Sequence, residues 1–323
     1  MIFFESLPFY RLKRQRLHLE KVSYSDPCTK TGQGNDGKFF VARDQDYIGS
    51  YRILKLVRAG SSCQIWEAMS ESDNRRCALK SLQEEHRGDK EQIGLLKHEF
   101  NVGHTLKHPN IIEIYEYDVA KGLPFVALEY FDSNNLKQWI RLKRDDAESR
   151  GHLPDVIRRC AEGLAYLHQH DWIHCDIKPD NFLINRSYEV KLIDFAIAQK
   201  EKKGLSRLFG GKSKIQGTRS YMSPEQIRGG TLDPRSDVYS FGCMLFELSC
   251  GRPPFTGGSP DELLQKHLRA PIPNLNASSD EASSDYAKLV AKMMAKKPED
   301  RPHSMSQFLD EFKSIRMVRP KRR

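Results

Sequence analysis

The feature that most constrains this chain is a polar cluster between two short apolar runs, within residues 171–196. Asp176, Asn181 and Asp194 are oxygen donors, and Lys178 is a cation only a few residues from them. Mg²⁺ prefers such hard oxygen ligands and usually takes one or two carboxylates, which leaves its other positions to water and phosphate. A single Asp beside an Asn more often forms a turn or a helix cap. The interpretation therefore depends on the order and spacing of the whole string.

The stretch 174–181, His-Cys-Asp-Ile-Lys-Pro-Asp-Asn, is followed by Asp194-Phe-Ala. Together they resemble the catalytic loop and metal-binding segment of eukaryotic-type, bacterial-like Ser/Thr protein kinases. The resemblance implies that Asp176 accepts or orients the proton of the substrate hydroxyl and that Lys178 approaches the γ-phosphate of ATP. It also implies that Asn181 and Asp194 hold Mg²⁺, or Mn²⁺, between the phosphates.

Further landmarks of this family follow in order along the chain. A lysine two residues after Asp176 is typical of members that phosphorylate serine or threonine, and Thr218 matches the threonine that accompanies it. We therefore expect a protein substrate with such a hydroxyl. Glu225 should pair with Arg301, because arginine binds a carboxylate through two hydrogen bonds. Asp237 should brace the catalytic loop.

The N-terminal half resembles the small lobe of these kinases, with strands predicted at 51–57, 64–68 and 75–82. The family has a G-x-G-x-x-G turn between the first two strands, and its backbone amides lie over the ATP phosphates. Here Gly60 is the middle glycine, whereas Arg58 and Cys63 occupy the outer positions. Alone, this turn would indicate an ordinary hairpin. Lys80, in Ala-Leu-Lys on the third strand, matches the lysine that contacts the phosphates.

Apolar residues at three- and four-residue spacing predict a helix over residues 90–106. Glu99 on this helix matches the family's glutamate that forms an ion pair with Lys80 and thereby fixes it for ATP. Gly103 should cost about 1 kcal/mol relative to alanine in a helix interior. We therefore expect a mobile or kinked helix end at Gly103.

Two further strands are predicted at 111–117 and 123–128, and helices at 135–142 and 153–170. Leu128 and the residues after it resemble the hinge between the lobes, where backbone groups of Glu129 and Phe131 would pair with adenine. The charged run 145–151 reads as an exposed loop from its composition.

The fold expected from the resemblance is α+β and bilobal, with motifs matching over roughly residues 50–312. A small antiparallel β-sheet lobe with one helix should precede a larger, mainly helical lobe. The expected organisation is an N-terminal extension and linker at 1–46, a small lobe at 47–128, a large lobe at 129–313 and a basic tail at 314–323.

Three departures from the family pattern bear on activity. Cys175 replaces the arginine that usually precedes the catalytic Asp and binds a phosphorylated residue of the activation loop, so the chain reads as a non-RD kinase. We expect it to act without activation-loop phosphorylation. Ala196 replaces the glycine after Asp194-Phe, and the turn around Gly60 has lost its outer glycines. These changes leave a pseudokinase, a nucleotide-binding scaffold, as the alternative.

The formal net charge of +9 is concentrated in two segments. Residues 200–214 contain six Lys or Arg against one Glu, and residues 312–323 contain six against none. Such charge is informative about partners rather than about the fold. The hypotheses are an acidic substrate or partner for the first segment and weak membrane-surface contact for the second, against an ordinary solvated surface. Nucleic-acid binding is not expected, and no oligomeric state is indicated.

Seven scattered cysteines form no C-x-x-C pair, which favours a reducing cytosol, and we expect a cytoplasmic protein. We expect no membrane span, because no apolar run is long enough. We also expect no signal peptide, because the apolar start of the sequence is short and has no basic region before it. Cys63 and Cys175 would lie near the phosphates. A redox role there needs a lowered thiol pKa, and space-filling is the commoner role.

Overall fold

The computed structural model describes residues 47–143, 146–202, 216–279 and 282–318. The predicted N-terminal extension, most of the basic loop and the last five residues of the basic tail lie outside the described residues. The hypotheses on partners of those segments therefore remain predictions.

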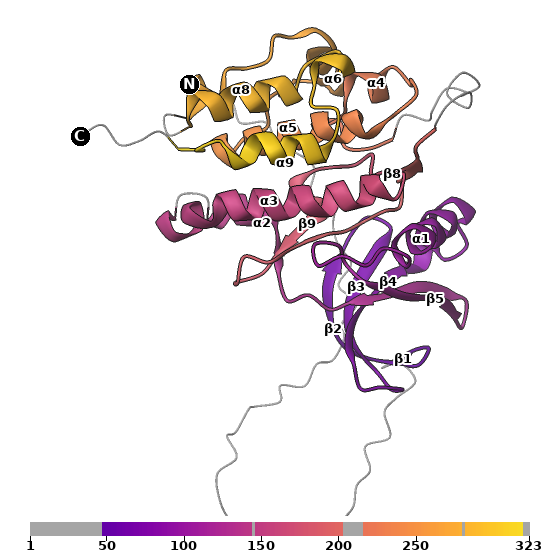
Figure 1. Cartoon of the computed structure of the whole chain (residues 1–323). Helices are drawn as coiled ribbons and strands as arrows, with labels where there is room; N and C mark the ends of the chain where they lie inside the picture. The colour runs from indigo at the N-terminus through magenta and orange to yellow at the C-terminus, as the bar shows by residue number, and fades with distance from the viewer. Residues whose placement is uncertain (1–46, 144–145, 203–215, 280–281, 319–323) are drawn as a thin grey trace, which may run out of the picture. The chain divides into compact units, whose positions relative to one another are not determined.

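The small lobe is an antiparallel sheet with strand order β1-β2-β3-β4-β6-β5, accompanied by helix α1 (Figure 1). Side chains alternate between the two faces of β4, so Lys80 points away from its buried neighbour Leu79. An apolar cluster that includes Leu79 and Phe125 covers one face and leaves the other for Lys80. The elements are β1 (Tyr47–Ile48), β2 (Tyr51–Ala59), β3 (Cys63–Ser70), β4 (Arg76–Leu82), a short 3-10 turn (Glu84–His86), α1 (Lys90–Gly103), β5 (Ile114–Ala120) and β6 (Leu123–Glu129).

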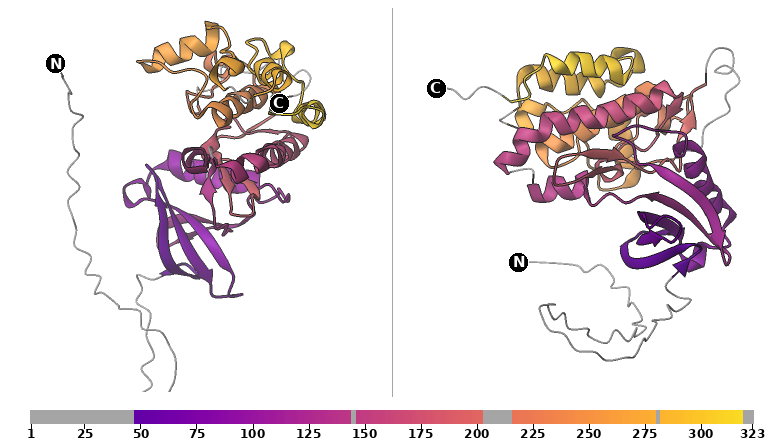
Figure 2. Two further views of the ribbon diagram at one scale, coloured as in Figure 1. Left: turned by 90° about the vertical axis from the view of Figure 1, so that its left-hand side faces the viewer. Right: turned by 60° about the horizontal axis from the view of Figure 1, so that its bottom comes forward.

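The large lobe is mainly helical, and its helices surround α5 (Figures 1 and 2). Residues 236–248 of α5 are all buried, as in a helix at the centre of a core. Its helices are α2 (Leu136–Lys143), α3 (Ala147–Gln169), α4 (Pro224–Ile227), α5 (Pro234–Cys250), α6 (Pro260–Arg269), α7 (Leu275–Ser278), α8 (Ser284–Met293) and α9 (Met305–Lys313). Its short strands are β7 (Asn134–Asn135), β8 (Trp172–Ile173), β9 (Phe182–Ile184), β10 (Val190–Leu192) and β11 (Gln199–Lys200). The α+β fold of two lobes agrees with the prediction.

The loop between α1 and β5 fastens the small lobe to the large one. Asn110 donates from Nδ2 to the Val190 carbonyl at 3.0 Å and accepts at its own carbonyl from the Leu192 amide at 2.8 Å. Gly163 of α3 packs so closely on this loop that a Cβ would lie 2.6 Å from the Asn110 carbonyl oxygen. The Asn110 loop is therefore bonded to strand β10, which precedes Asp194, and packed against α3.

Several predicted boundaries were wrong. Helix α3 begins at Ala147, so most of the expected loop at 145–151 is helical. The cause is a cap: the Asp146 side chain accepts from the Ser149 amide at 3.0 Å. Pro154 then lies inside α3 instead of starting it. The fifth strand begins at Ile114 rather than at residue 111.

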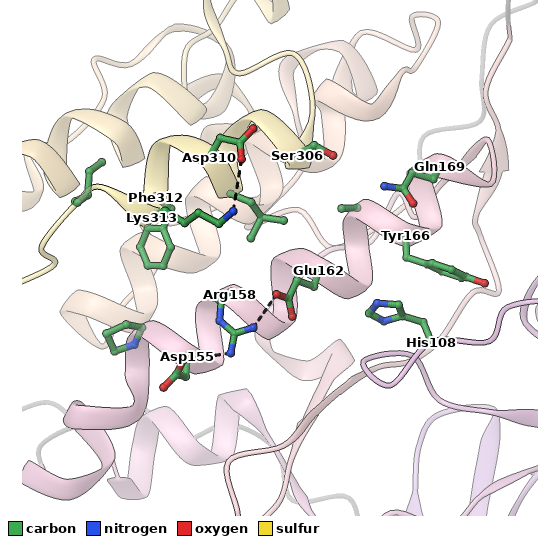
Figure 3. A pocket seen from close by; sticks show the side chains of 14 residues that line it. His108, Asp155, Arg158, Glu162, Tyr166, Gln169, Ser306, Asp310, Phe312 and Lys313 are labelled. Atoms are coloured by element: carbon green, nitrogen blue, oxygen red, sulfur yellow. Dashed lines mark hydrogen bonds and ion pairs between the residues drawn. The ribbon is translucent and has the colours of Figure 1, made fainter.

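A groove of about 470 Å³ runs between α3 and α9 (Figure 3). Arg158 on its α3 wall bonds Glu162 at 2.7 Å and Asp155 at 3.2 Å, while Lys313 and Asp310 face each other on α9 at 3.9 Å. None of its lining residues belongs to the predicted site.

Candidate active site

The catalytic loop, residues 174–181, is fixed to the core through the carboxylate of Asp237 on α5. Asp237 accepts from the His174 amide at 2.7 Å and from the Cys175 amide at 2.9 Å. His168, on the preceding helix, contacts the same carboxylate at 2.9 Å. Cys175 has φ of 67°, a left-handed conformation that non-glycine residues adopt only when their surroundings enforce it. Asp237 and its neighbours enforce it here.

Asp176, Lys178 and Thr218 form one hydrogen-bonded group. Lys178 Nζ donates to Asp176 Oδ2 at 2.6 Å and to Thr218 Oγ1 at 2.7 Å. The Thr218 amide donates to Asp176 Oδ1 at 2.8 Å. Both carboxylate oxygens of Asp176 are thus oriented, although the three residues span 42 positions in sequence. These predicted site residues lie together.

Asn181 and Asp194 have the donor chemistry that Mg²⁺ requires. Asn181 Nδ2 donates to the Asp176 carbonyl at 2.8 Å and to Asp176 Oδ2 at 3.2 Å, which leaves the amide oxygen as the group that can accept or coordinate. The Asn181 carbonyl accepts from the Ile193 amide at 2.9 Å, so Asn181 is tied to the residue before Asp194. One carboxylate and one amide oxygen fit a cation that takes its remaining ligands from phosphate and water.

Lys80 lies between Glu99 and Asp194. Its Nζ is 2.6 Å from Glu99 Oε2 and 3.2 Å from Asp194 Oδ1. Burial alone would lower the pKa of Lys80, but the two carboxylates outweigh burial and raise it. The same ammonium group lowers the pKa of the Asp194 carboxyl below its ordinary value. Lys80 and Asp194 are therefore both charged, as an ATP phosphate and its cation would require.

Asp194 sits at the start of a turn with an unusual backbone. Its φ is 71°, whereas Ala196 is not among the described residues with positive φ. Position 196 therefore does not need the left-handed conformation that favours glycine, and an alanine can occupy it. The turn closes through a bond from the Ala198 amide to the Phe195 carbonyl at 3.1 Å.

The turn predicted to cover the phosphates is closed on itself. The Gly60 amide donates to the Cys63 carbonyl at 2.8 Å, and Gln83 Nε2 donates to the Gly60 carbonyl. In this arrangement the Gly60 amide points to the Cys63 carbonyl and is not available to another acceptor. Burial raises the pKa of the Cys63 thiol, and burial also raises that of Cys175. Neither thiol has the thiolate character of a redox sensor.

The expected hinge begins at Glu129, the last residue of β6. Lys191 Nζ lies 2.8 Å from Glu129 Oε2 and forms an ion pair with it. The same ammonium group lies 5.7 Å from the centre of the Phe131 ring. Lys191 is on β10, so it joins the hinge to the strand that leads to Asp194. Sequence reasoning missed this residue.

Gln226 is a second residue that the sequence reasoning missed. Its Nε2 donates to the Cys175 carbonyl at 2.8 Å, and its Oε1 accepts from the Ser223 amide at 3.0 Å. Ser-Pro-Glu-Gln is a capping-box pattern, which identifies the start of α4. That pattern could have located the helix, but it gives no indication of the contact with the catalytic loop.

Beside Thr218 the surface is hollowed, with a volume of about 700 Å³. Its lining comes from the segment after Gly217 and from the start of α6. The hollow adjoins the group formed by Asp176, Lys178 and Thr218, because Thr218 belongs to both. The lining residues are Gly217, Thr218, Arg219, Ser220, Met222, Gly257, Gly258, Ser259, Pro260 and Leu263.

Gly103 allows α1 to approach the core. It is the last residue of α1, so the helix ends at the glycine as expected and three residues before the predicted limit at 106. A Cβ at this position would lie 2.3 Å from Ile114 Cδ1 and 3.1 Å from the Phe195 ring. The glycine is needed because Phe195, the neighbour of Asp194, packs directly on the helix end.

Replacing Gly103 with alanine should destabilise the protein by about 1–3 kcal/mol, because the core around Ile114 and Phe195 must shift. Gly94→Ala in the same helix is the control, since nothing lies within 4 Å of a Cβ there. Urea unfolding of both variants measures the difference. Equal stability of the two variants would contradict the packing argument.

Residues 51–312 match the family model described as the protein kinase domain, and the chain belongs to that family. It is 30% identical to the serine/threonine-protein kinase PrkC of Bacillus subtilis over 253 residues, which are 77% of this chain and 38% of PrkC. It is 33% identical to the serine/threonine-protein kinase PknB of Mycobacterium tuberculosis over 256 residues, which are 78% of this chain and 40% of PknB. The matches thus cover about two fifths of the length of these relatives. The predicted family and fold are confirmed.

Among the residues that the structure describes, no helix combines the length and the apolar character needed to cross a membrane.

Proposed function

We propose that this chain transfers the γ-phosphate of ATP to serine or threonine hydroxyls of proteins. The observation that carries the proposal is the group in which Lys178 bonds both Asp176 and Thr218. This group lies beside a surface hollow that suits an extended peptide. Similarity to bacterial serine/threonine-protein kinases supports the same conclusion.

The proposed mechanism depends on position and charge rather than on covalent chemistry. Asp176 orients the substrate hydroxyl and accepts its proton, because bonds from Thr218 and Lys178 fix the carboxylate. Lys178 would stabilise the charge on the transferred phosphate. Lys80, held by Glu99, would contact the other phosphates.

Nucleotide and metal complete this proposed site. Asn181 and Asp194 would hold Mg²⁺, or Mn²⁺, which neutralises phosphate charge when bound. The turn at Gly60 would cover the phosphates after its bond to Cys63 opens. Backbone groups of Glu129 and Phe131 would pair with adenine.

We further propose that activity does not require a phosphorylated activation loop, as in a non-RD kinase. Cys175, in place of arginine, is only 4% exposed and lies in an apolar cluster with Ile173 and Leu232. A phosphate would find no cation at this side chain. The Lys80–Glu99 ion pair is nevertheless closed, with its atoms 2.6 Å apart.

The test is transfer of radiolabelled phosphate from ATP to a generic basic protein with Mg²⁺, before and after phosphatase treatment of the full chain. We expect the two rates to be equal. Loss of activity after dephosphorylation would overturn the proposal about activation while leaving the enzymatic proposal intact.

A second candidate is a nucleotide-binding scaffold without transfer activity. The self-closed turn at Gly60 favours it, since its amide already has a partner. ATP binding without transfer in the same assay, with both Mg²⁺ and Mn²⁺, would support this alternative.

A further inference from the structure

We propose that His98 is a positioning residue: it bonds α1 to the backbone beyond Asp194 and so holds Glu99 against Lys80 without a phosphate. The inference rests on the proposed function, because it explains how the Lys80–Glu99 pair closes. The observation that supports it is a hydrogen bond of 2.8 Å from His98 Nε2 to the Ala198 carbonyl, between residues 100 positions apart in the sequence.

The bond joins the two elements that must meet at Lys80. His98 and Glu99 are successive residues of α1 and therefore point about 100° apart around the helix axis. Glu99 reaches Lys80, while His98 reaches Ala198. Ala198 is fixed in turn, because its amide closes the turn from Phe195. The orientation of α1 is thus set against the same turn that begins with Asp194.

The segment that receives the bond is anchored in the large lobe. Gln199 and Lys200 form β11, which pairs with Trp172 and Ile173 of β8 just before the catalytic loop. Because His98 is bonded at the residue just before β11, α1 is linked through this strand pair to the catalytic loop.

Trp172 restrains the imidazole. The rings of His98 and Trp172 meet edge to face, with centroids 5.9 Å apart and planes at 74°. Lys200 Nζ lies 4.7 Å from the centre of the same Trp172 ring and donates to the His170 carbonyl at 2.9 Å. These contacts hold the Trp172 ring in place, and the ring in turn restricts the orientation of the His98 imidazole.

The chemistry of the bond makes it independent of phosphorylation. Its acceptor is a carbonyl oxygen, so His98 must donate from Nε2, and an imidazole can do so in its neutral and its cationic form. In an arginine cluster that binds a phosphate, the like charges repel one another and have no counter-charge until the phosphate binds. Here the neutral carbonyl of Ala198 accepts the bond that positions α1. Cys175, in place of an arginine, adds no charge that would need a phosphate.

The experiment compares His98→Ala, His98→Gln and His104→Ala in the dephosphorylated full chain. Glutamine can donate from its side-chain amide, so it should restore much of what alanine removes. His104 is the matched control, because it is exposed at the end of α1 and its Nδ1 contacts the Phe100 carbonyl of the same helix instead of another element. Each variant is assayed for kcat, KM for ATP, thermal midpoint and hydrogen exchange of residues 90–103.

We expect His98→Ala to lower kcat by about three- to tenfold, the effect of one lost hydrogen bond. KM for ATP should change less, and amide exchange in α1 should become faster. His98→Gln should recover part of kcat, and His104→Ala should match the wild type. A lowered thermal midpoint with unchanged kcat and unchanged α1 exchange would overturn the proposal, as would a glutamine variant no better than alanine.

The outcomes separate this inference from the proposed function. If the wild type transfers no phosphate, the proposed function fails. The exchange of α1 in His98→Ala still tests the contact in that case, because hydrogen exchange needs no activity. Faster exchange would retain the structural link, and unchanged exchange would reject it.

Discussion

Asp176→Asn is expected to lower kcat for phosphate transfer by about 10²–10⁴-fold, the usual contribution of a positioned general base. Asparagine can keep an oxygen toward the Thr218 amide, which now donates at 2.8 Å. Its NH₂ group would then face Lys178 Nζ and Asn181 Nδ2, which are both donors. The variant loses the proton acceptor and also places donors against each other.

The measurement is steady-state transfer from radiolabelled ATP, with the thermal midpoint recorded for each protein. Asp285→Asn is the control, because its carboxylate lies on the exposed surface of α8 with its side chain 74% exposed. It should transfer at the wild-type rate. Full activity in Asp176→Asn would remove Asp176 from the chemistry. A large fall in its thermal midpoint would show that folding, rather than the reaction, was affected.

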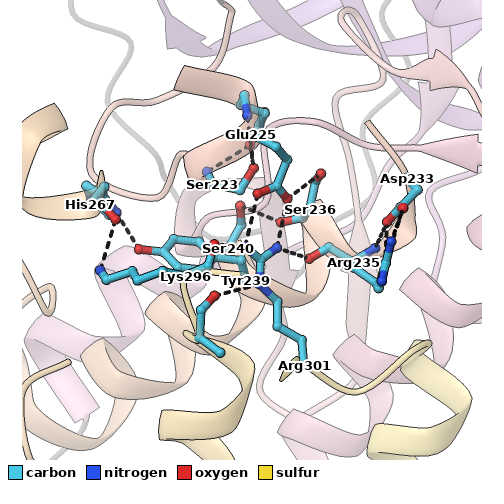
Figure 4. A network of polar contacts seen from close by, with 12 residues as sticks. Ser223, Glu225, Asp233, Arg235, Ser236, Tyr239, Ser240, His267, Lys296 and Arg301 are labelled. Atoms are coloured by element: carbon cyan, nitrogen blue, oxygen red, sulfur yellow. Dashed lines mark hydrogen bonds and ion pairs between the residues drawn. The ribbon is translucent and has the colours of Figure 1, made fainter. Parts of the chain in front are cut away.

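Glu225→Gln should reduce the free energy of unfolding by about 3–5 kcal/mol, because it leaves the buried charge of Arg301 uncompensated. The Arg301 side chain is 0% exposed, and its guanidinium bonds both oxygens of Glu225 at 2.7 and 3.0 Å (Figure 4). It also donates to the carbonyls of Ala295 and Arg235, each at 2.8 Å. Glutamine would keep one acceptor and lose the charge.

Acid should reproduce part of this loss in the wild type. Burial would raise the pKa of Glu225, but the bonds and charge of Arg301 outweigh it and lower the pKa below 4.5. A carboxyl with a depressed folded-state pKa stabilises the protein above the unfolded value and loses that contribution as the pH falls through the folded value. The stability of Glu225→Gln should therefore depend less on pH below 4.5 than that of the wild type.

Urea unfolding followed by circular dichroism measures both effects. Arg158→Gln is the control, since its ion pairs with Asp155 and Glu162 are partly exposed in the groove of Figure 3. Such pairs contribute about 1 kcal/mol or less. A loss for Glu225→Gln no larger than that of Arg158→Gln would show that the buried pair is not a principal support of the large lobe.

The site was predictable where several residues of one motif lie close in sequence. Asp176, Lys178 and Asn181 fall within six positions, and their types and spacing determine their neighbours once the loop forms. The sheet and α1 were predictable because alternation and helical spacing mark a buried face. Such patterns do not locate the ends of elements, where a single cap such as Asp146 decides the boundary.

Contacts between elements that are distant in sequence could not be predicted from the sequence pattern. His98 bonds a backbone carbonyl, and any residue at position 198 would offer the same atom. Helix propensity makes Gly103 only a cost, whereas packing against Ile114 and Phe195 explains why a glycine is there. Gln226 occupies a capping-box position, and its bond to the Cys175 carbonyl depends on how the lobe folds.

The bond from the Gly60 amide to the Cys63 carbonyl has a consequence for how nucleotides compete. Phosphates can use that amide only in molecules whose turn has opened, so the apparent affinity for ATP is the affinity of the open form multiplied by its population. Adenosine, which has no phosphate, does not require the opening. The advantage of ATP over adenosine should therefore be smaller in this protein than in a kinase whose turn is already open. Replacements that loosen the turn should widen that advantage without adding a contact to the nucleotide.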